Sequence, residues 1–265
     1  MNHAKAIQDK INNIKHLDFG DILGDSLNLF KKTWLQGFVF FLIAIIALIP
    51  FFAAIYMPIY KSVLEEINNG ADPSQLSSLD MDSFRLMVIG LGVIISFFMV
   101  PLTASFYRIV KKIDFKEDFS FKDFFYFFKN DYLAKIAAIV SLTVLVSLIN
   151  YGLEMALPEL YAGILNIVLS LVFNMLSLLM IVLMAFNPEL SASEVINLAI
   201  SLGLKKGLLI LGLLIVAAII GSLGVIACGI GMLFTFSIVY LPNYHIYKEV
   251  IGFDDISDID KIGIE

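Results

Sequence analysis

Between Lys206 and Lys248 the chain runs for 41 residues without a formally charged side chain, with His245 counted as neutral. In a helix with a rise of 1.5 Å per residue, this run would measure roughly 62 Å, which is about twice the ~30 Å thickness of the hydrocarbon layer of a bilayer. Gly229 and Gly231 near its midpoint can form a tight turn. The run therefore predicts two membrane-spanning helices joined by a short turn.

The overall composition agrees with this prediction. Hydrophobic residues make up 59% of the chain and charged residues only 16%, whereas a soluble domain carries about 25% charged residues. The charged residues are absent from long blocks, which is typical of a polytopic membrane protein. The net charge of −6 argues against a nucleic-acid partner. The single cysteine, Cys228, excludes an intramolecular disulfide.

Six apolar blocks predict an all-α polytopic membrane protein. We expect a single integral membrane domain over residues 1–252 and an acidic C-terminal tail over 253–265. The N-terminal 34 residues carry charges of both signs, so we expect no cleaved secretory signal. The predicted spans are about 37–60, 86–110, 134–153, 160–186, 207–226 and 230–247.

The positions of lysine and arginine predict the orientation of these spans. Only Lys61 and Arg85 fall on one side, and the other 16 of the 18 basic residues fall on the opposite side or at its boundary. Cytoplasmic loops carry the excess of basic residues. Both termini are therefore expected in the cytoplasm, and the connections near 61–85, 152–159 and 228–231 on the outer side.

Each pair of spans is preceded by a segment with helical periodicity, so we expect three hairpins that each follow a cytoplasmic interfacial amphipathic helix. These helices are predicted at about 19–34, 120–132 and 191–205. The second segment places four phenylalanines on one face, and a basic cluster precedes it. Either the segments only anchor the hairpins, or they contact lipids or a partner protein. The candidate contact residues are Phe121, Phe124, Phe125, Phe128, Arg108, Lys111 and Lys112.

Two asparagines, Asn166 and Asn174, interrupt the fourth predicted span. An unpaired amide costs several kcal/mol in hydrocarbon. Either these side chains form hydrogen bonds between helices, or they line a hydrophilic seam that admits a lipid headgroup.

The chain resembles a set of bacterial six-helix membrane families related to the membrane domain of some glycerophosphoryl diester phosphodiesterases. The resemblance is carried by "FGDILGDSLNLFKKTW" (19–34), "VPLTASFYRIVKKIDFKEDFSFKDFF" (100–125) and "LGVIACGIGMLFTFSIVYLPNYHIYKEVIG" (223–252). It implies the non-catalytic membrane module, because the soluble barrel that performs the phosphodiesterase reaction has no counterpart in this chain.

The sequence contains no nucleotide-binding loop, no paired-cysteine metal motif and no H-E-x-x-H pattern. We therefore expect no catalytic residues, no cofactor and no metal. The hypothesis is a non-enzymatic scaffold or accessory protein of the bacterial inner membrane. Its expected partners are membrane lipids, other membrane proteins or further copies of itself. The alternative is a transporter or channel for a neutral or lipidic solute, since an ion-coupled carrier normally needs charged residues at membrane depth.

Overall fold

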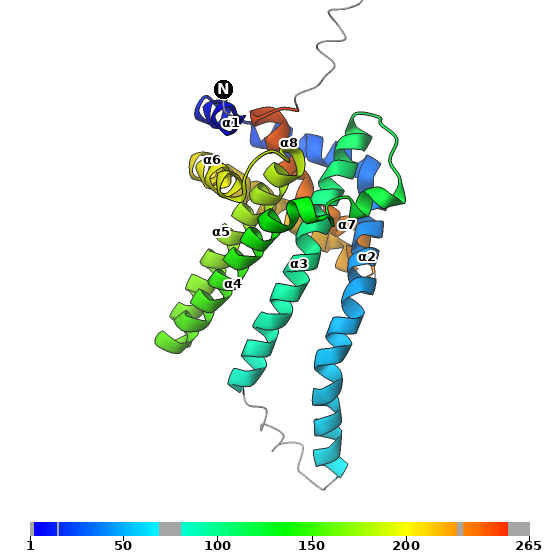
Figure 1. The fold of residues 1–265 in the computed structure, drawn as a ribbon, viewed down its shortest axis with the longest axis vertical. Helices are drawn as coiled ribbons and strands as arrows, with labels where there is room; N and C mark the ends of the chain where they lie inside the picture. Colours follow the sequence, from blue (N-terminus) through cyan, green and yellow to red (C-terminus); the bar gives the residue numbers. More distant parts are fainter. Residues whose placement is uncertain (1–2, 15, 69–80, 227–229, 254–265) are drawn as a thin grey trace, which may run out of the picture.

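The computed structural model describes residues 3–14, 16–68, 81–226 and 230–253. In this part of the chain all of the regular secondary structure is helical (Figure 1). The α-helices are α1 (His3–Asn12), α2 (Phe19–Asn68), α3 (Met81–Asp114), α4 (Leu133–Ala156), α5 (Glu159–Phe186), α6 (Ala192–Ser222), α7 (Gly231–Thr235) and α8 (Leu241–Val250). The short 3-10 helices are η2 (Phe121–Phe125), η3 (Asn130–Tyr132), η4 (Leu223–Ile226) and η5 (Phe236–Tyr240).

Within the described residues, five helical segments are long and apolar enough to cross a membrane. They are Phe19–Ala54, Met87–Asp114, Asn130–Ala156, Glu159–Phe186 and Ala192–Ile226. The chain therefore has the character of a multi-pass membrane protein. The later part of α2, the helix α3 and the closely packed pair α4 and α5 run along the long axis and diverge from one another toward the end opposite α1 and α8 (Figure 1).

The hydrophobic core is concentrated at one end of the molecule. In α5, Leu179 and Leu183 near the C-terminal end are completely buried, whereas Leu160 and Ile167 near the N-terminal end are 70% and 64% exposed. The same gradient runs along α3 in the same chain direction, because Val88 near its N-terminal end is 46% exposed and Ile109 near its C-terminal end is completely buried. Apolar side chains exposed all round a helix are expected where hydrocarbon, not protein, covers them.

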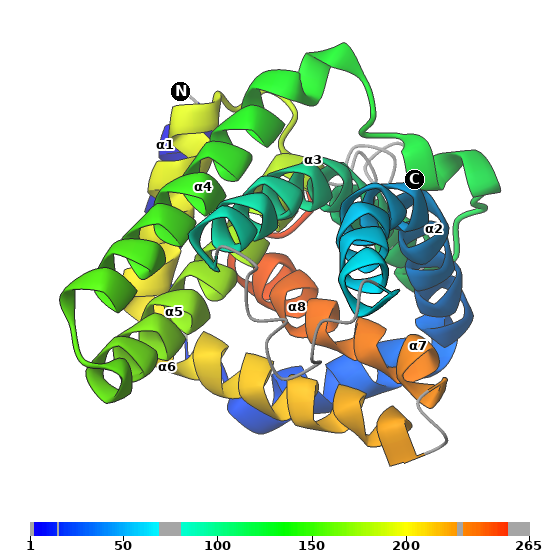
Figure 2. The ribbon, with the colours of Figure 1, turned by 90° about the horizontal axis from the view of Figure 1, so that it is seen from below.

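The C-terminal helix α8 lies in the middle of the packed end. Its residues from Leu241 to Tyr247 are all buried, and it contacts α2, α5 and α6 around it (Figure 2). Polar contacts attach it to α3, because the Tyr244 hydroxyl donates to Asp114 at 2.8 Å and the Lys248 ammonium lies 2.6 Å from the same carboxylate. The core is thus built around the last helix of the described residues.

The predicted interfacial segments 19–34 and 191–205 are helical, but each continues into the span that follows. The side chain of Asp18 accepts hydrogen bonds from the backbone N–H groups of Gly20 and Asp21 and so caps α2. Ser191 and Glu194 form a capping box at the start of α6. At Lys206 the backbone leaves the helical region (φ −128°, ψ 15°), and α6 changes direction there (Figure 2).

Residues 120–132 do not form the predicted amphipathic α-helix. They form η2 and η3, separated by a turn. Contacts with α3 determine this geometry, because Asp123 pairs with Lys112 and the backbone N–H of Phe127 donates to the hydroxyl of Ser105. These contacts place Phe127 and Phe124 in the core.

The predicted sixth span, 230–247, consists of α7, η5 and α8 in place of one continuous helix. Pro242 stands in the first turn of α8, and its ring cannot donate a backbone hydrogen bond to the preceding turn. This accounts for the break between η5 and α8. The predicted glycine turn lies partly outside the described residues, as do residues 69–80 of the 61–85 connection and nearly all of the acidic tail.

The close approach of α2 and η5 depends on Gly37, because a Cβ atom at this position would overlap the side chain of Ser237. We expect Gly37→Ala to lower the free energy of unfolding by about 1–3 kcal/mol, the usual cost of overpacking. Gly90→Ala on α3 is the matched control, since nothing lies within 4 Å of its added Cβ. The melting temperatures of the two variants are measured by thermal unfolding in detergent. Equal melting temperatures would contradict the close packing at Gly37.

Candidate functional site

The four phenylalanines predicted to share one face are divided between the core and the surface. Phe124 is buried, with 2% exposure, whereas Phe121, Phe125 and Phe128 are 62%, 41% and 40% exposed. The ring centroids of Phe121 and Phe125 are 5.7 Å apart, and those of Phe125 and Phe128 are 5.8 Å apart. These three residues form a continuous surface, the exposed phenylalanine cluster.

The predicted basic cluster lies behind this surface and makes several contacts within the protein. The Lys112 ammonium lies 3.0 Å and 3.1 Å from the two carboxylate oxygens of Asp123. The Arg108 guanidinium stacks 3.7 Å from the centroid of the Tyr126 ring, and Lys111 lies 4.5 Å from that of Phe253. The basic side chains therefore hold the 120–128 segment and Phe253 against α3.

Asp123 is the centre of this attachment. Partial burial of its carboxyl favours the neutral form, but the hydrogen bond from the Ser120 backbone N–H and the charges of Lys112 and Arg108 outweigh it and lower the pKa. A carboxyl whose pKa is lower in the folded state stabilises the protein above its unfolded pKa. That stabilisation is lost as the pH falls through the folded pKa.

We expect Asp123→Asn to lower the free energy of unfolding at pH 7 by about 1 kcal/mol, because a charge-assisted hydrogen bond is lost. The difference from the unmodified protein should begin to shrink as the pH falls below about 4, the unfolded pKa, and should disappear below the lower folded pKa, where Asp123 is protonated in both the folded and the unfolded protein. Melting curves in detergent across this pH range test the expectation. Asp118→Asn, an exposed carboxyl in the same connection, is the control, and an equal effect of the two substitutions would argue against the role of Asp123.

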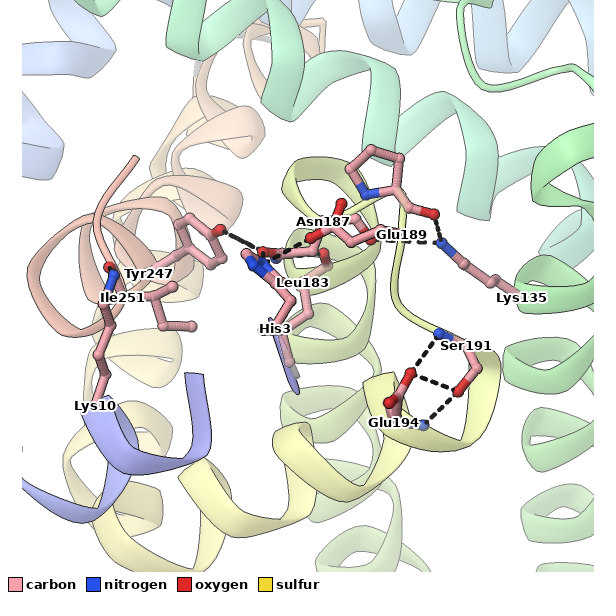
Figure 3. Close-up of polar contacts among 11 residues, drawn as sticks. His3, Lys10, Lys135, Leu183, Asn187, Glu189, Ser191, Glu194, Tyr247 and Ile251 are labelled. Atoms are coloured by element: carbon pink, nitrogen blue, oxygen red, sulfur yellow. Dashed lines mark hydrogen bonds and ion pairs between the residues drawn. The ribbon is translucent and has the colours of Figure 1, made fainter. Parts of the chain in front are cut away.

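A second polar cluster joins four helices around Asn187 (Figure 3). The amide nitrogen of Asn187 donates to the Leu183 carbonyl at 2.8 Å and lies 3.0 Å from the Tyr247 hydroxyl. Its oxygen lies 3.1 Å from the ring Nε2 of His3, which is 2.6 Å from Glu189. The cluster completes the hydrogen bonding at the end of α5 and connects it to α1 and α8. We interpret it as structural.

Asn187 was not among the sequence-predicted site residues. The signal that could have indicated it is the Asn-Pro dipeptide at 187–188, which favours a turn immediately after a helix. Lys135 of α4 also reaches this turn, because its ammonium donates to the Pro188 carbonyl at 2.5 Å.

A cavity of about 900 Å³ lies between α5, α6 and η5. Both predicted seam residues, Asn166 and Asn174, line it, together with Ser170. These three residues are one helical turn apart on α5 and form a stripe along one wall, the α5 polar stripe. The facing wall from α6 and η5 is mainly apolar and includes Leu211, Leu214, Ile215, Ala218, Ile219, Phe236 and Val239.

The members of the α5 polar stripe differ in their hydrogen bonding. The amide nitrogen of Asn166 donates to Glu154 at 3.1 Å, but its buried oxygen has no hydrogen-bond partner within the described part of the chain. Asn174 is exposed, and no hydrogen bond links its amide to the other described residues. The stripe thus presents the unused donor and acceptor of the Asn174 amide to the cavity, whereas the Asn166 oxygen is buried within the protein.

The hydroxyl groups of α4 do not line the cavity. Ser141, Thr143 and Ser147 each donate to the carbonyl four residues earlier in their own helix. This is the usual way in which a hydroxyl is satisfied inside an apolar helix. Asn150 of α4 contacts the stripe directly, since its amide nitrogen donates to the Ser170 hydroxyl at 3.4 Å.

Comparison of the chain with protein-family models, with curated proteins and with solved structures gives no match. Among the described residues, no group of three or more His, Cys, Asp and Glu side chains is arranged to hold a metal ion. The exposed phenylalanine cluster and the α5 cavity are therefore the two candidate sites.

Proposed function

We propose that the protein is a non-enzymatic integral membrane protein that acts through contacts with lipids or with other membrane proteins. The observation that carries the proposal is the exposed phenylalanine cluster, which is held rigidly at the packed end of the molecule. Burial of a phenylalanine side chain in an apolar environment contributes about 1.5–3 kcal/mol. Three such side chains in a fixed arrangement give a strong contact with a membrane interface or a partner surface.

The charges around the cluster support a position at the headgroup level. Lys122 and Lys129 flank the phenylalanines and are exposed. Each basic residue near an anionic leaflet contributes on the order of 1 kcal/mol. Aromatic side chains together with lysine are typical of a segment that lies in the interfacial zone.

The placement that we propose is a bacterial inner membrane, crossed six times, with both termini in the cytoplasm. The contact between α1 and the end of α8 supports termini on the same side, because the Lys10 ammonium donates to the Ile251 carbonyl at 2.6 Å. The distribution of basic residues supports the cytoplasmic side. The resemblance to the six-helix bacterial families favours the same arrangement and stays a prediction.

A single tryptophan moved into the cluster tests its position. Trp34 is the only tryptophan of the chain, so the Trp34→Phe/Phe125→Trp variant reports on residue 125 alone. In liposomes we expect quenching of its fluorescence by lipids brominated near the headgroup, because the ring lies in the interface. Strong quenching by aqueous acrylamide, with no quenching by brominated lipid, would place the cluster in water and overturn its role in lipid contact.

Removal of the cluster tests the partner contact. We expect the Phe121→Ser/Phe125→Ser/Phe128→Ser variant to lose lipids or proteins that co-purify with the unmodified protein in mild detergent, as measured by mass spectrometry. Phe124 is left in place because it belongs to the core. Phe119→Ser, an exposed phenylalanine outside the cluster, is the matched control. Retention of every native partner by the triple variant would contradict the proposal.

The cavity favours a second candidate function, passage of a neutral or lipidic solute. Its volume lies within the range of ligand sites, and its α5 wall carries polar groups at membrane depth. In proteoliposomes, Ala218→Phe should reduce the flux of such a solute because it fills the cavity. Ala134→Phe, at an exposed position on α4, should leave the flux unchanged; equal fluxes for the unmodified protein and empty liposomes would exclude this function.

A further inference from the structure

We propose that the cavity between α5, α6 and η5 binds one membrane lipid with an uncharged headgroup that carries several hydroxyl groups, such as a glycosylated diacylglycerol. The headgroup lies along the α5 polar stripe, and the acyl chains leave the cavity into the bilayer. This inference rests on the proposed membrane placement and names the lipid class for this cavity, which is separate from the exposed phenylalanine cluster.

The apolar side chains at the cavity indicate that its occupant comes from the bilayer. Ile167, Ile215 and Ile219 line the cavity and are 64%, 45% and 57% exposed. They belong to two helical segments that are apolar enough to span a membrane. An exposed apolar border at membrane depth faces hydrocarbon, so acyl chains can lie across it without contacting water.

The electrostatic character of the cavity favours an uncharged headgroup. None of the described residues that line it carries a formal charge. The nearest charge identified along the stripe is the Glu154 carboxylate, which accepts the hydrogen bond from Asn166 at 3.1 Å. A phosphate group would have no cation to pair with here and would be repelled by Glu154, since an unpaired charge is costly in a low-dielectric site.

The α5 polar stripe selects a headgroup with more than one hydroxyl. Asn166, Ser170 and Asn174 extend over eight residue steps, or roughly 12 Å of helix. A single hydroxyl reaches only one of these side chains, whereas a sugar-sized headgroup reaches two or three. The exposed Asn174 amide both donates and accepts, and the exposed Ser170 hydroxyl supplies a second polar contact.

The predicted consequence is selective, saturable binding that depends on Asn174. The full-length protein is purified in detergent and its thermal unfolding measured with added monoglucosyl-diacylglycerol, diacylglycerol or phosphatidylglycerol. We expect the glycolipid to raise the melting temperature with one lipid bound per chain in native mass spectrometry, because a ligand that binds only the folded state stabilises it. Diacylglycerol and phosphatidylglycerol should bind at least threefold more weakly.

Asn174→Leu is the decisive variant. Its amide has no hydrogen bond to the other described residues, so its loss should leave the melting temperature without lipid unchanged or higher. We expect its affinity for the glycolipid to fall by about threefold to thirtyfold, the effect of one hydrogen bond inside a membrane. Ser141→Leu, at an exposed position on α4 outside the cavity, should bind like the unmodified protein.

Ala218→Phe supplies a second variant that does not depend on polar groups. It fills the cavity and should abolish the one-to-one binding. Equal binding of all three lipids, or unchanged glycolipid binding in either Asn174→Leu or Ala218→Phe, would overturn the inference. Because none of these measurements involves residues 121–128, they separate failure at the cavity from failure of the exposed phenylalanine cluster.

Discussion

Burial of α8 within the other helices is the interaction on which the rest of the structure depends. It fixes the packed end of the molecule, because α2, α5 and α6 all contact this helix and α3 is attached to it through Asp114. The opposite ends of the long helices have few protein neighbours and expose their apolar side chains. The molecule therefore combines a closely packed end around α8 with long helices whose opposite ends expose apolar side chains suited to contact with hydrocarbon.

This division explains why the two candidate sites differ in character. The exposed phenylalanine cluster belongs to the rigid end, where Asp123 and its basic partners hold the backbone. The α5 polar stripe belongs to the part of the molecule where the helices begin to separate. Rigid attachment suits a contact surface, while incomplete packing between α5 and α6 leaves the space that a ligand can occupy.

Local signals in the sequence were sufficient to predict the bounds and type of some helices but not of others. The span predicted at 160–186 agrees with α5 (Glu159–Phe186), because Pro158 and the Asn187-Pro188 pair mark both ends. The segment 120–132 was predicted as a helix from its periodicity, but remote partners on α3 fold it into η2 and η3. Such contacts between residues far apart in the sequence leave no local pattern.

The candidate sites could also be predicted only in part, because they depend on contacts between residues far apart in the sequence. Asn166 and Asn174 were predictable because polar residues are conspicuous inside an apolar helix, and they do line one cavity. The opposite wall, from α6 and η5, consists of ordinary apolar residues and could not be assigned without the fold. Phe124 could not be separated from its exposed neighbours because 3-10 and α-helical geometries place different residues on one face.

The central position of α8 also has a consequence for biogenesis. This helix is translated after every other helix of the described chain, yet it fills the middle of their assembly. The earlier helices therefore enter the bilayer before α8 is present, and they pack around α8 only after it has been synthesised. During that interval Asn187, at the end of α5, lacks its contact with Tyr247 of α8, so synthesis and insertion of α8 complete the packed end of the protein.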